Sequence, residues 1–197
     1  MEYNKDKREI VSNKNLNELD KFVLKFINIL KKHVDYVIIS GYVSIILGRS
    51  RATEDVDVFI KKISKTQFNE LYSDMKENGF WCINAESVDD IFDYLLSGLA
   101  VRFALEGKGV PNFEVKFPKD KLDDEAFEDF IKVILPEGEL KISSLERHIA
   151  FKRYYLSSDK DMEDALHVEE LFKDKINYDK INKLKLLIKN RKNGNRK

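Results

Sequence analysis

Residues 38–60 read IISGYVSIILGRSRATEDVDVFI, and this stretch decides the interpretation of the fold. Residues 36–40, YVIIS, are short and β-branched, which predicts a buried strand. The apolar segment between Gly41 and Gly48 predicts a short helix. Residues 55–60, DVDVFI, begin with an acidic–apolar alternation and predict a second strand that opens with two carboxylates.

The two carboxylates, Asp55 and Asp57, point to one face of that strand because side chains two residues apart share a face. Val56, Val58 and Ile60 then face the opposite side and pack. Neighbouring carboxylates repel each other unless a cation lies between them. Oxygen ligands suit Mg²⁺, with Mn²⁺ as the alternative, so the pair predicts a metal site.

Residues just upstream are suited to phosphate. Gly41 lets the backbone approach an anion closely at the start of a helix, and Arg49 and Arg51 provide forked donors for phosphate oxygens. The alternative is a simple turn glycine and two arginines in ordinary surface ion pairs, which contribute little to stability.

Composition limits the class of protein. The chain has 197 residues, of which 43% are hydrophobic, so it is long enough to bury a core. Lys+Arg and Asp+Glu number 35 each, which argues against a general nucleic-acid coat protein. Cys82 is the single cysteine, which excludes an intramolecular disulfide. No run approaches the roughly 20 apolar residues of a membrane span, and we expect a cytoplasmic protein.

Periodicity and turn signals predict alternating helices and strands, which indicates a mixed α/β sheet with flanking helices. Expected helices cover 16–33 with Asn15 as N-cap, 66–78, 87–97, 143–156 with Ser143 as N-cap, 158–172 and 177–190. Expected strands cover 80–84, 101–105, 112–117 and two extended pieces within 132–143. We expect residues 1–15 to be a loose lead-in, and a division into an α/β domain, 1–140, and a helical region, 141–197.

The segment SGYVSIILGRSRATEDVDVFI, residues 40–60, resembles the first motif of the DNA polymerase β-like nucleotidyltransferase superfamily. The matching positions are Gly41, Arg51, Thr53, Asp55, Val56 and Asp57. The resemblance implies a nucleotidyltransferase-like mixed sheet with a helical C-terminal part, Mg²⁺ or Mn²⁺ at the aspartates, and a nucleoside triphosphate as substrate. Tyr42 departs from the family, which often has Ser or Gly at that nucleotide-binding position.

The resemblance also implies a third carboxylate from a later strand, acting as metal ligand or base. Glu114 in NFEVKF, residues 112–117, is the candidate, because Phe113, Val115 and Phe117 occupy the other face. An exposed strand face, on which Glu114 pairs with Lys116, is the alternative that the residues leave open.

The C-terminal half holds a second pattern. Lys152 lies three residues after Ile149 and four before Leu156, beside an apolar helical stripe. The segment resembles the K…KD-x-x-D pattern of abortive-infection-toxin-type nucleotidyltransferases, which implies nucleotide-pocket roles for a further set of residues. That set is Lys152, Lys160, Asp161 and Asp164. The alternative is helix capping, because acids in a first turn favour the helix dipole.

Two functions remain open at this point. The first is a Mg²⁺-dependent nucleotidyltransferase whose acceptor is an RNA such as tRNA, a protein or a small molecule. The second is a catalytically inert module of the same fold, binding a protein partner in a toxin–antitoxin-type system. The basic end, 183–197, either contacts nucleic-acid phosphates or is simply solvated.

Overall fold

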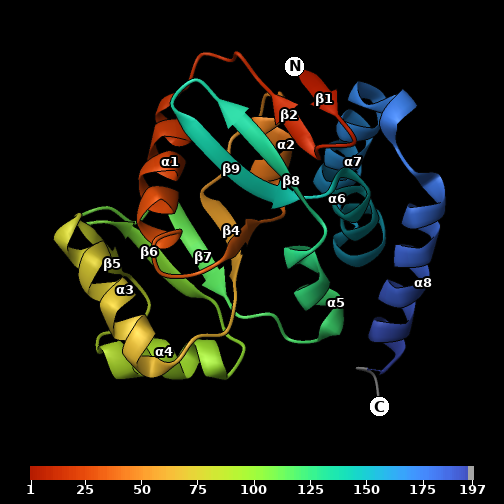
Figure 1. Cartoon of the computed structure of the whole chain (residues 1–197). Coiled ribbons are helices and arrows are strands. Elements are labelled where there is room, and N and C mark those ends of the chain that lie inside the picture. The colour runs from red at the N-terminus through yellow and green to blue at the C-terminus, as the bar shows by residue number, and fades with distance from the viewer. Residues whose placement is uncertain (195–197) are drawn as a thin grey trace.

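A computed structural model describes residues 1–194, which form one mixed sheet of nine strands in the order β1-β2-β8-β9-β3-β4-β7-β6-β5, with helices packed on it (Figure 1). The strands are β1 (Glu2–Asn4), β2 (Glu9–Val11), β3 (Tyr36–Ile38), β4 (Asp55–Ile60), β5 (Phe80–Cys82), β6 (Val101–Leu105), β7 (Asn112–Lys116), β8 (Phe130–Leu135) and β9 (Gly138–Ser143). The expected mixed sheet with flanking helices and a helical C-terminal part is confirmed.

The helices are α1 (Glu18–Leu30), α2 (Gly41–Ile46), α3 (Lys65–Glu77), α4 (Val88–Leu96), α5 (Lys121–Asp124), α6 (Leu145–Phe151), α7 (Asp159–Leu171) and α8 (Tyr178–Gly194). A π-helical turn, Lys152–Leu156, continues α6, and 3₁₀ turns cover Glu125–Phe127 and Lys173–Lys175. Helices α6, α7 and α8 are grouped at one side of the molecule, away from α3 and α4 (Figure 1). None of the helices described is both long and apolar enough to span a membrane.

The alternation in β4 positions its acids as the sequence predicts. Val56 and Val58 are fully buried, while Asp55 and Asp57 are half-buried on the other face. Strand β7 lies parallel to β4, and Val56 is opposite Phe113 in the register. Phe113 stacks on Phe26 of α1 with ring centroids 3.8 Å apart. Burying each such side chain stabilises the fold by about 1.5–3 kcal/mol, which fixes the face on which the acids lie.

The N-terminal lead-in was expected to be loose, and this expectation is wrong. Strands β1 and β2 form a hairpin, and β2 pairs in parallel with β8. Ile10 lies opposite Val133 and is fully buried. A three-residue strand with one buried side chain has too little periodicity to be recognised before its partner strand is known.

Two helix caps lie one or two residues from their expected positions. The Asn17 side chain, in place of Asn15, accepts from Asp20 N–H, and the Asp20 carboxylate accepts from Asn17 N–H. Ser144, in place of Ser143, caps α6 by accepting from Arg147 N–H. The predicted cap of α7, Ser158 with Asp161, is confirmed as a reciprocal capping box.

The division at residue 140 stays a prediction. Residue 140 lies within β9, which pairs with β3 and β8 inside the sheet. The basic end, 183–197, is helical as far as Gly194, and residues 195–197 lie outside the described part of the chain.

Candidate functional site

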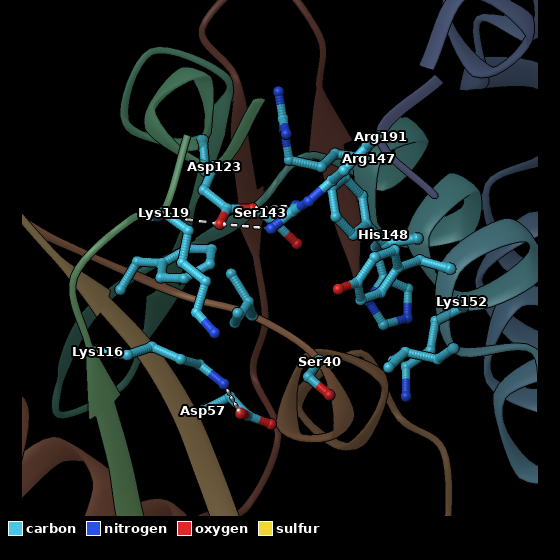
Figure 2. A pocket seen from close by; sticks show the side chains of 16 residues that line it. Ser40, Asp57, Lys116, Lys119, Asp123, Ser143, Arg147, His148, Lys152 and Arg191 are labelled. Carbon is cyan, nitrogen blue, oxygen red and sulfur yellow. Dashed lines mark hydrogen bonds and ion pairs between the residues drawn. The ribbon is translucent and has the colours of Figure 1, made fainter. Parts of the chain in front are cut away.

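A cavity of about 260 Å³ lies between the sheet and the C-terminal helices (Figure 2). Asp57 of β4 and Lys116 of β7 lie on its sheet side, and His148 of α6 and Lys152 lie across from them. Its charged lining residues are Asp57, Lys116, Lys119, Asp123, Arg147, Lys152 and Arg191. Cations therefore outnumber acids, as a site for a polyanion requires.

The predicted third acid lies beside the second. Asp57 is directly opposite Glu114 in the parallel β4–β7 register, and Glu114 is directly opposite Arg102 in the antiparallel β6–β7 register. Directly opposite side chains in neighbouring strands are close enough to interact. The side chains of Asp57, Glu114 and Arg102 thus form a row across one face of the sheet.

Each acid of this row is paired with a cation of the sheet. Lys116 Nζ lies 2.6 Å from Asp57 Oδ1 (Figure 2). Arg102 donates to Glu114 Oε1 from Nε at 2.9 Å and from Nη2 at 2.6 Å. Glu114 lies on the face of the aspartates, as predicted. It also pairs with a basic residue, as in the alternative that the sequence left open. The partner is Arg102, not Lys116.

Asp55 lies at the start of β4 and is held by its own loop. Thr53 Oγ1 donates to Asp55 Oδ1 at 3.2 Å and to the Asp55 carbonyl at 3.0 Å. Thr53 therefore fixes the first acid of the pair, and its hydroxyl is committed to that role.

The acids have the right chemistry for Mg²⁺ or Mn²⁺ but are not assembled as a ligand set. Within residues 1–194, no three or more His, Cys, Asp or Glu side chains are grouped closely enough to hold a metal ion. Carboxylates on neighbouring strands fit a hard cation. A metal at Asp57 and Glu114 has to replace Lys116 and Arg102 as their counter-ions.

The two loop arginines, predicted to bind phosphate, both bind a buried acid of α7. Asp164 is fully buried, and Arg49 Nη1 donates to its Oδ1. Arg51 Nη2 donates to Asp164 Oδ2 at 3.2 Å. Arg51 Nε lies 3.1 Å from Asp164 Oδ1 without hydrogen-bond alignment, so that contact is electrostatic only.

Lys152 joins the same group from the π-helical turn. Its Nζ lies 2.8 Å from Asp164 Oδ2 and 2.6 Å from Asp161 Oδ1. We name Arg49, Arg51, Lys152, Asp161 and Asp164 the Asp164 cluster. Burial opposes charge on Asp164, but the hydrogen bond and charge of Lys152, helped by the two arginines, outweigh it and lower the pKa of Asp164. Asp164 is therefore ionised at neutral pH.

Asp161 carries both of the roles weighed from the sequence. It completes the capping box with Ser158 and also accepts from Lys152. Lys160, by contrast, has an exposed side chain, and its backbone carbonyl accepts from Arg49 Nη1 at 3.0 Å. The structure thus brings Lys152, Asp161 and Asp164 together and leaves the Lys160 side chain outside.

Gly41 leaves room for Arg51. A Cβ added at Gly41 would lie 2.2 Å from Arg51 Nη2. The close approach predicted for a phosphate is made instead by the guanidinium that binds Asp164. This glycine links the start of α2 to the Asp164 cluster.

Tyr42 requires a correction. We expected it at the nucleotide, but its side chain is fully buried on the core side of α2, and its hydroxyl donates to Asp20 Oδ1 at 2.8 Å. Burial, together with the charge of Asp20, raises the pKa of Tyr42. The side chain that lines the cavity at this turn is Ser40 (Figure 2).

Sequence reasoning missed Ser40. Its backbone has φ 60° and ψ −136°, a region that residues other than glycine rarely adopt and that costs about 1–3 kcal/mol. Strain of this size at a cavity wall is typical of functional sites. No sequence signal predicts it, because serine ordinarily avoids this conformation.

Among the five cavity cations, Lys119 is distinct. Its ammonium makes no hydrogen bond or ion pair with any residue from 1 to 194, whereas Arg191 binds Asp123 at 2.7 Å and 3.1 Å. Arg147 donates to the Leu122 carbonyl at 2.7 Å. The alternation in EVK indicated that Lys116 shares the Glu114 face, but nothing in the sequence placed Lys119, Arg147 or Arg191 here.

His148 separates the cavity from α2. It is buried, and its Nε2 lies 2.9 Å from Ser44 Oγ. Burial, with the positive charge of Lys152, lowers the pKa of His148 to about 3. His148 is therefore neutral at physiological pH.

Solved structures of other proteins match most of this chain. The antibiotic-resistance factor ANT(2'')-Ia, in its solution structure, matches with TM-score 0.56 and 12% identity over 88% of this chain and 92% of that one. ANT(2'')-Ia in complex with adenylyl-2''-tobramycin matches with TM-score 0.56 and 13% identity over 87% and 97%. An antigenic nucleotidyltransferase-like protein from Paracoccidioides brasiliensis matches with TM-score 0.52 and 15% identity over 90% and 91%.

No protein-family model matches this sequence, and no curated protein matches it. At 12–15% identity, likeness to solved structures bears on the fold alone. The chain therefore has a nucleotidyltransferase-like fold.

Proposed function

We propose that this protein is a metal-dependent nucleotidyltransferase that transfers a nucleotide from a nucleoside triphosphate to an acceptor. The observation that carries the proposal is the cavity in which lysines and arginines face Asp57. The fold is consistent with it, since one structural relative was solved in complex with adenylyl-2''-tobramycin. The acceptor class, whether RNA such as tRNA, protein or small molecule, stays open.

The cavity residues bind and orient the triphosphate. The Lys119 ammonium contacts the phosphates directly, while Lys152, whose ammonium binds Asp161 and Asp164, contributes positive charge from another wall of the cavity. Ser40 offers a hydroxyl at the turn before α2. Clustered cations stabilise the charge that develops on the phosphates as the transfer proceeds.

The transfer has a simple atom balance. An acceptor oxygen forms a bond to the α-phosphorus, the bond from that phosphorus to the bridging oxygen of the pyrophosphate breaks, and pyrophosphate leaves. Glu114 takes the proton of the attacking hydroxyl once Arg102 has turned away from it. Asp55, Asp57 and Glu114 would hold Mg²⁺ or Mn²⁺, which supplies charge neutralisation at the phosphates when bound.

The test is transfer of label. The protein is incubated with each α-³²P-labelled nucleoside triphosphate and Mg²⁺ against RNA, protein and small-molecule pools. Asp57→Asn is expected to lower transfer by about 100-fold or more. The matched control is Asp93→Asn, which removes an exposed carboxylate of α4 and leaves transfer unchanged. Equal transfer by wild type and Asp57→Asn would exclude the proposal.

A second candidate is an inert module of the same fold that binds a protein partner. It is favoured by the pairing of Asp57 with Lys116 and of Glu114 with Arg102, which satisfies both acids without a metal. Calorimetry with ATP in the presence and absence of Mg²⁺ separates the candidates. Metal-dependent ATP binding supports the enzyme, and its absence supports the inert module.

A further inference from the structure

The cations that pair with Asp57 and Glu114 differ in their surroundings. Arg102 has a side chain that is 51% exposed, at the outer end of the row of charges. The Lys116 side chain is 23% exposed and lines the cavity, with Nζ 2.6 Å from Asp57 Oδ1. Lys116 is thus the cation between the proposed metal ligand and the proposed phosphate site.

We propose that Lys116 is an internal counter-ion that competes with a divalent cation for Asp57 and becomes a ligand of the polyanion when the metal displaces it. The inference rests on the proposed metal site at Asp57. It assigns Lys116 a role in both the metal and the phosphate parts of the site.

Geometry supports competition at Asp57. The ammonium is in hydrogen-bond contact with Oδ1, so a metal that binds this oxygen has to take the place of Lys116. Glu114 lies directly opposite Asp57 in the β4–β7 register and brings a second negative charge to this part of the sheet. Without a cation, the two acids would repel each other, and Lys116 relieves that repulsion when no metal is bound.

The flexible side chain of Lys116 supports the second part of the proposal, that Lys116 becomes a ligand of the polyanion. Lys116 is a point charge on a flexible four-carbon chain, so rotation about single bonds moves its ammonium away from Asp57 into the cavity. Figure 2 shows the Lys119 ammonium pointing into the same part of the cavity. Two ammonium groups there repel each other unless an anion lies between them. Release of Lys116 therefore favours binding of a polyphosphate.

The test measures metal binding directly, without any assay of transfer. Free Mn²⁺ is followed by electron paramagnetic resonance during titration of the nucleotide-free protein. Lys116→Met is expected to bind Mn²⁺ about tenfold more tightly than wild type, which corresponds to about 1.4 kcal/mol. Lys116→Arg keeps the charge and is expected to bind as wild type does.

Lys119→Met is the matched control, because it removes a cavity lysine whose ammonium has no acidic partner among residues 1–194. Its Mn²⁺ affinity is expected to rise less than that of Lys116→Met, because the Lys119 ammonium does not occupy an oxygen of Asp57. With ATP and saturating Mg²⁺, the condition in which the metal has displaced Lys116 from Asp57, Lys116→Met and Lys119→Met are both expected to bind ATP more weakly than wild type.

Three results would overturn the inference: Mn²⁺ affinity of Lys116→Met no higher than that of wild type, an equal gain in Lys119→Met, or no detectable Mn²⁺ binding by either wild type or Lys116→Met. Adding Asp57→Asn to Lys116→Met is expected to abolish the gain, which locates it at Asp57. Lys116→Gln serves in place of Lys116→Met if that variant does not fold. If the expected Mn²⁺ result is obtained but no nucleotide transfer is found, the proposed enzymatic function is contradicted and the counter-ion role of Lys116 is still supported.

Discussion

Two groups of charges flank the cavity and are built differently. In the Asp164 cluster, one fully buried carboxylate binds Arg49, Arg51 and Lys152. On the sheet face, Asp57 is 16% exposed and has one lysine partner. A buried acid with three cations is fixed in place, whereas a partly solvated pair exchanges its partner readily. The comparison separates the structural charges of this site from the exchangeable ones.

The Asp164 cluster helps to position the strand that carries the Asp57–Lys116 pair. Arg49 and Arg51 lie in the loop between α2 and β4, and Thr53 of the same loop holds Asp55. Asp164 anchors this loop to α7, more than a hundred residues further along the chain. The C-terminal helices therefore anchor the loop that leads into β4, the strand that carries Asp57.

The largest effect is expected from removing the charge of Asp164. Asp164→Asn leaves buried cations of the Asp164 cluster without their shared acid, and breaking such a group costs about 3–5 kcal/mol. Urea denaturation measures the free energy of unfolding. Asp57→Asn is the matched variant, and its expected cost is about 0–1 kcal/mol because the Asp57–Lys116 pair is partly solvated. Equal costs for the two variants would remove the distinction between the two groups.

The next effect concerns His148, which lies between the two groups. Its pKa is about 3 when folded, compared with an ordinary value of 6.5. Between these values the unfolded chain binds a proton that the folded chain does not. Stability is therefore fully present above pH 6.5 and is lost as pH falls toward the folded pKa, by up to about 1.4 kcal/mol per pH unit.

His148→Gln keeps a partner for Ser44 but does not titrate. The free energy of unfolding is measured for wild type and variant by urea denaturation at several pH values between 7 and about 4.5. The difference between them is expected to shift in favour of the variant as pH falls. Asp164, whose pKa lies below its ordinary 3.8, stays ionised in the folded state over this range. A difference that stays constant with pH would show that His148 titrates normally in the fold.

Much of the fold is readable from local patterns. Strand β4 has the predicted bounds, Asp55–Ile60, because its buried valines alternate with half-buried acids. Gly79 ends α3 in the left-handed region, with φ 80°, after the predicted helix. Features set by neighbours in the sequence were predictable because the physics that determines them acts within a few residues.

Features set by distant partners were not readable. The sequence predicted a phosphate partner for Arg49 and left an ordinary ion pair as the alternative, and only the packing of α7 against α2 shows Asp164 as its partner. The partner of Glu114 depended on the β6–β7 register, which places Arg102 opposite it. Which of these charges pair with one another therefore required the tertiary structure.

The smallest effect tests the correction at Tyr42, which belongs to neither group of charges. Tyr42→Phe removes the hydrogen bond to buried Asp20, which keeps Lys14 Nζ at 2.9 Å and Asn17 N at 3.0 Å as partners. The expected loss of stability is about 1–2 kcal/mol. ATP affinity, measured by calorimetry, is expected to stay at the wild-type value because the Tyr42 ring is buried on the core side of α2. Ser40→Ala, on the cavity side of the same turn, is the contrasting variant and should weaken ATP binding with little change in the free energy of unfolding. Weaker ATP binding by Tyr42→Phe with unchanged stability would contradict the correction and indicate that Tyr42 contacts the nucleotide.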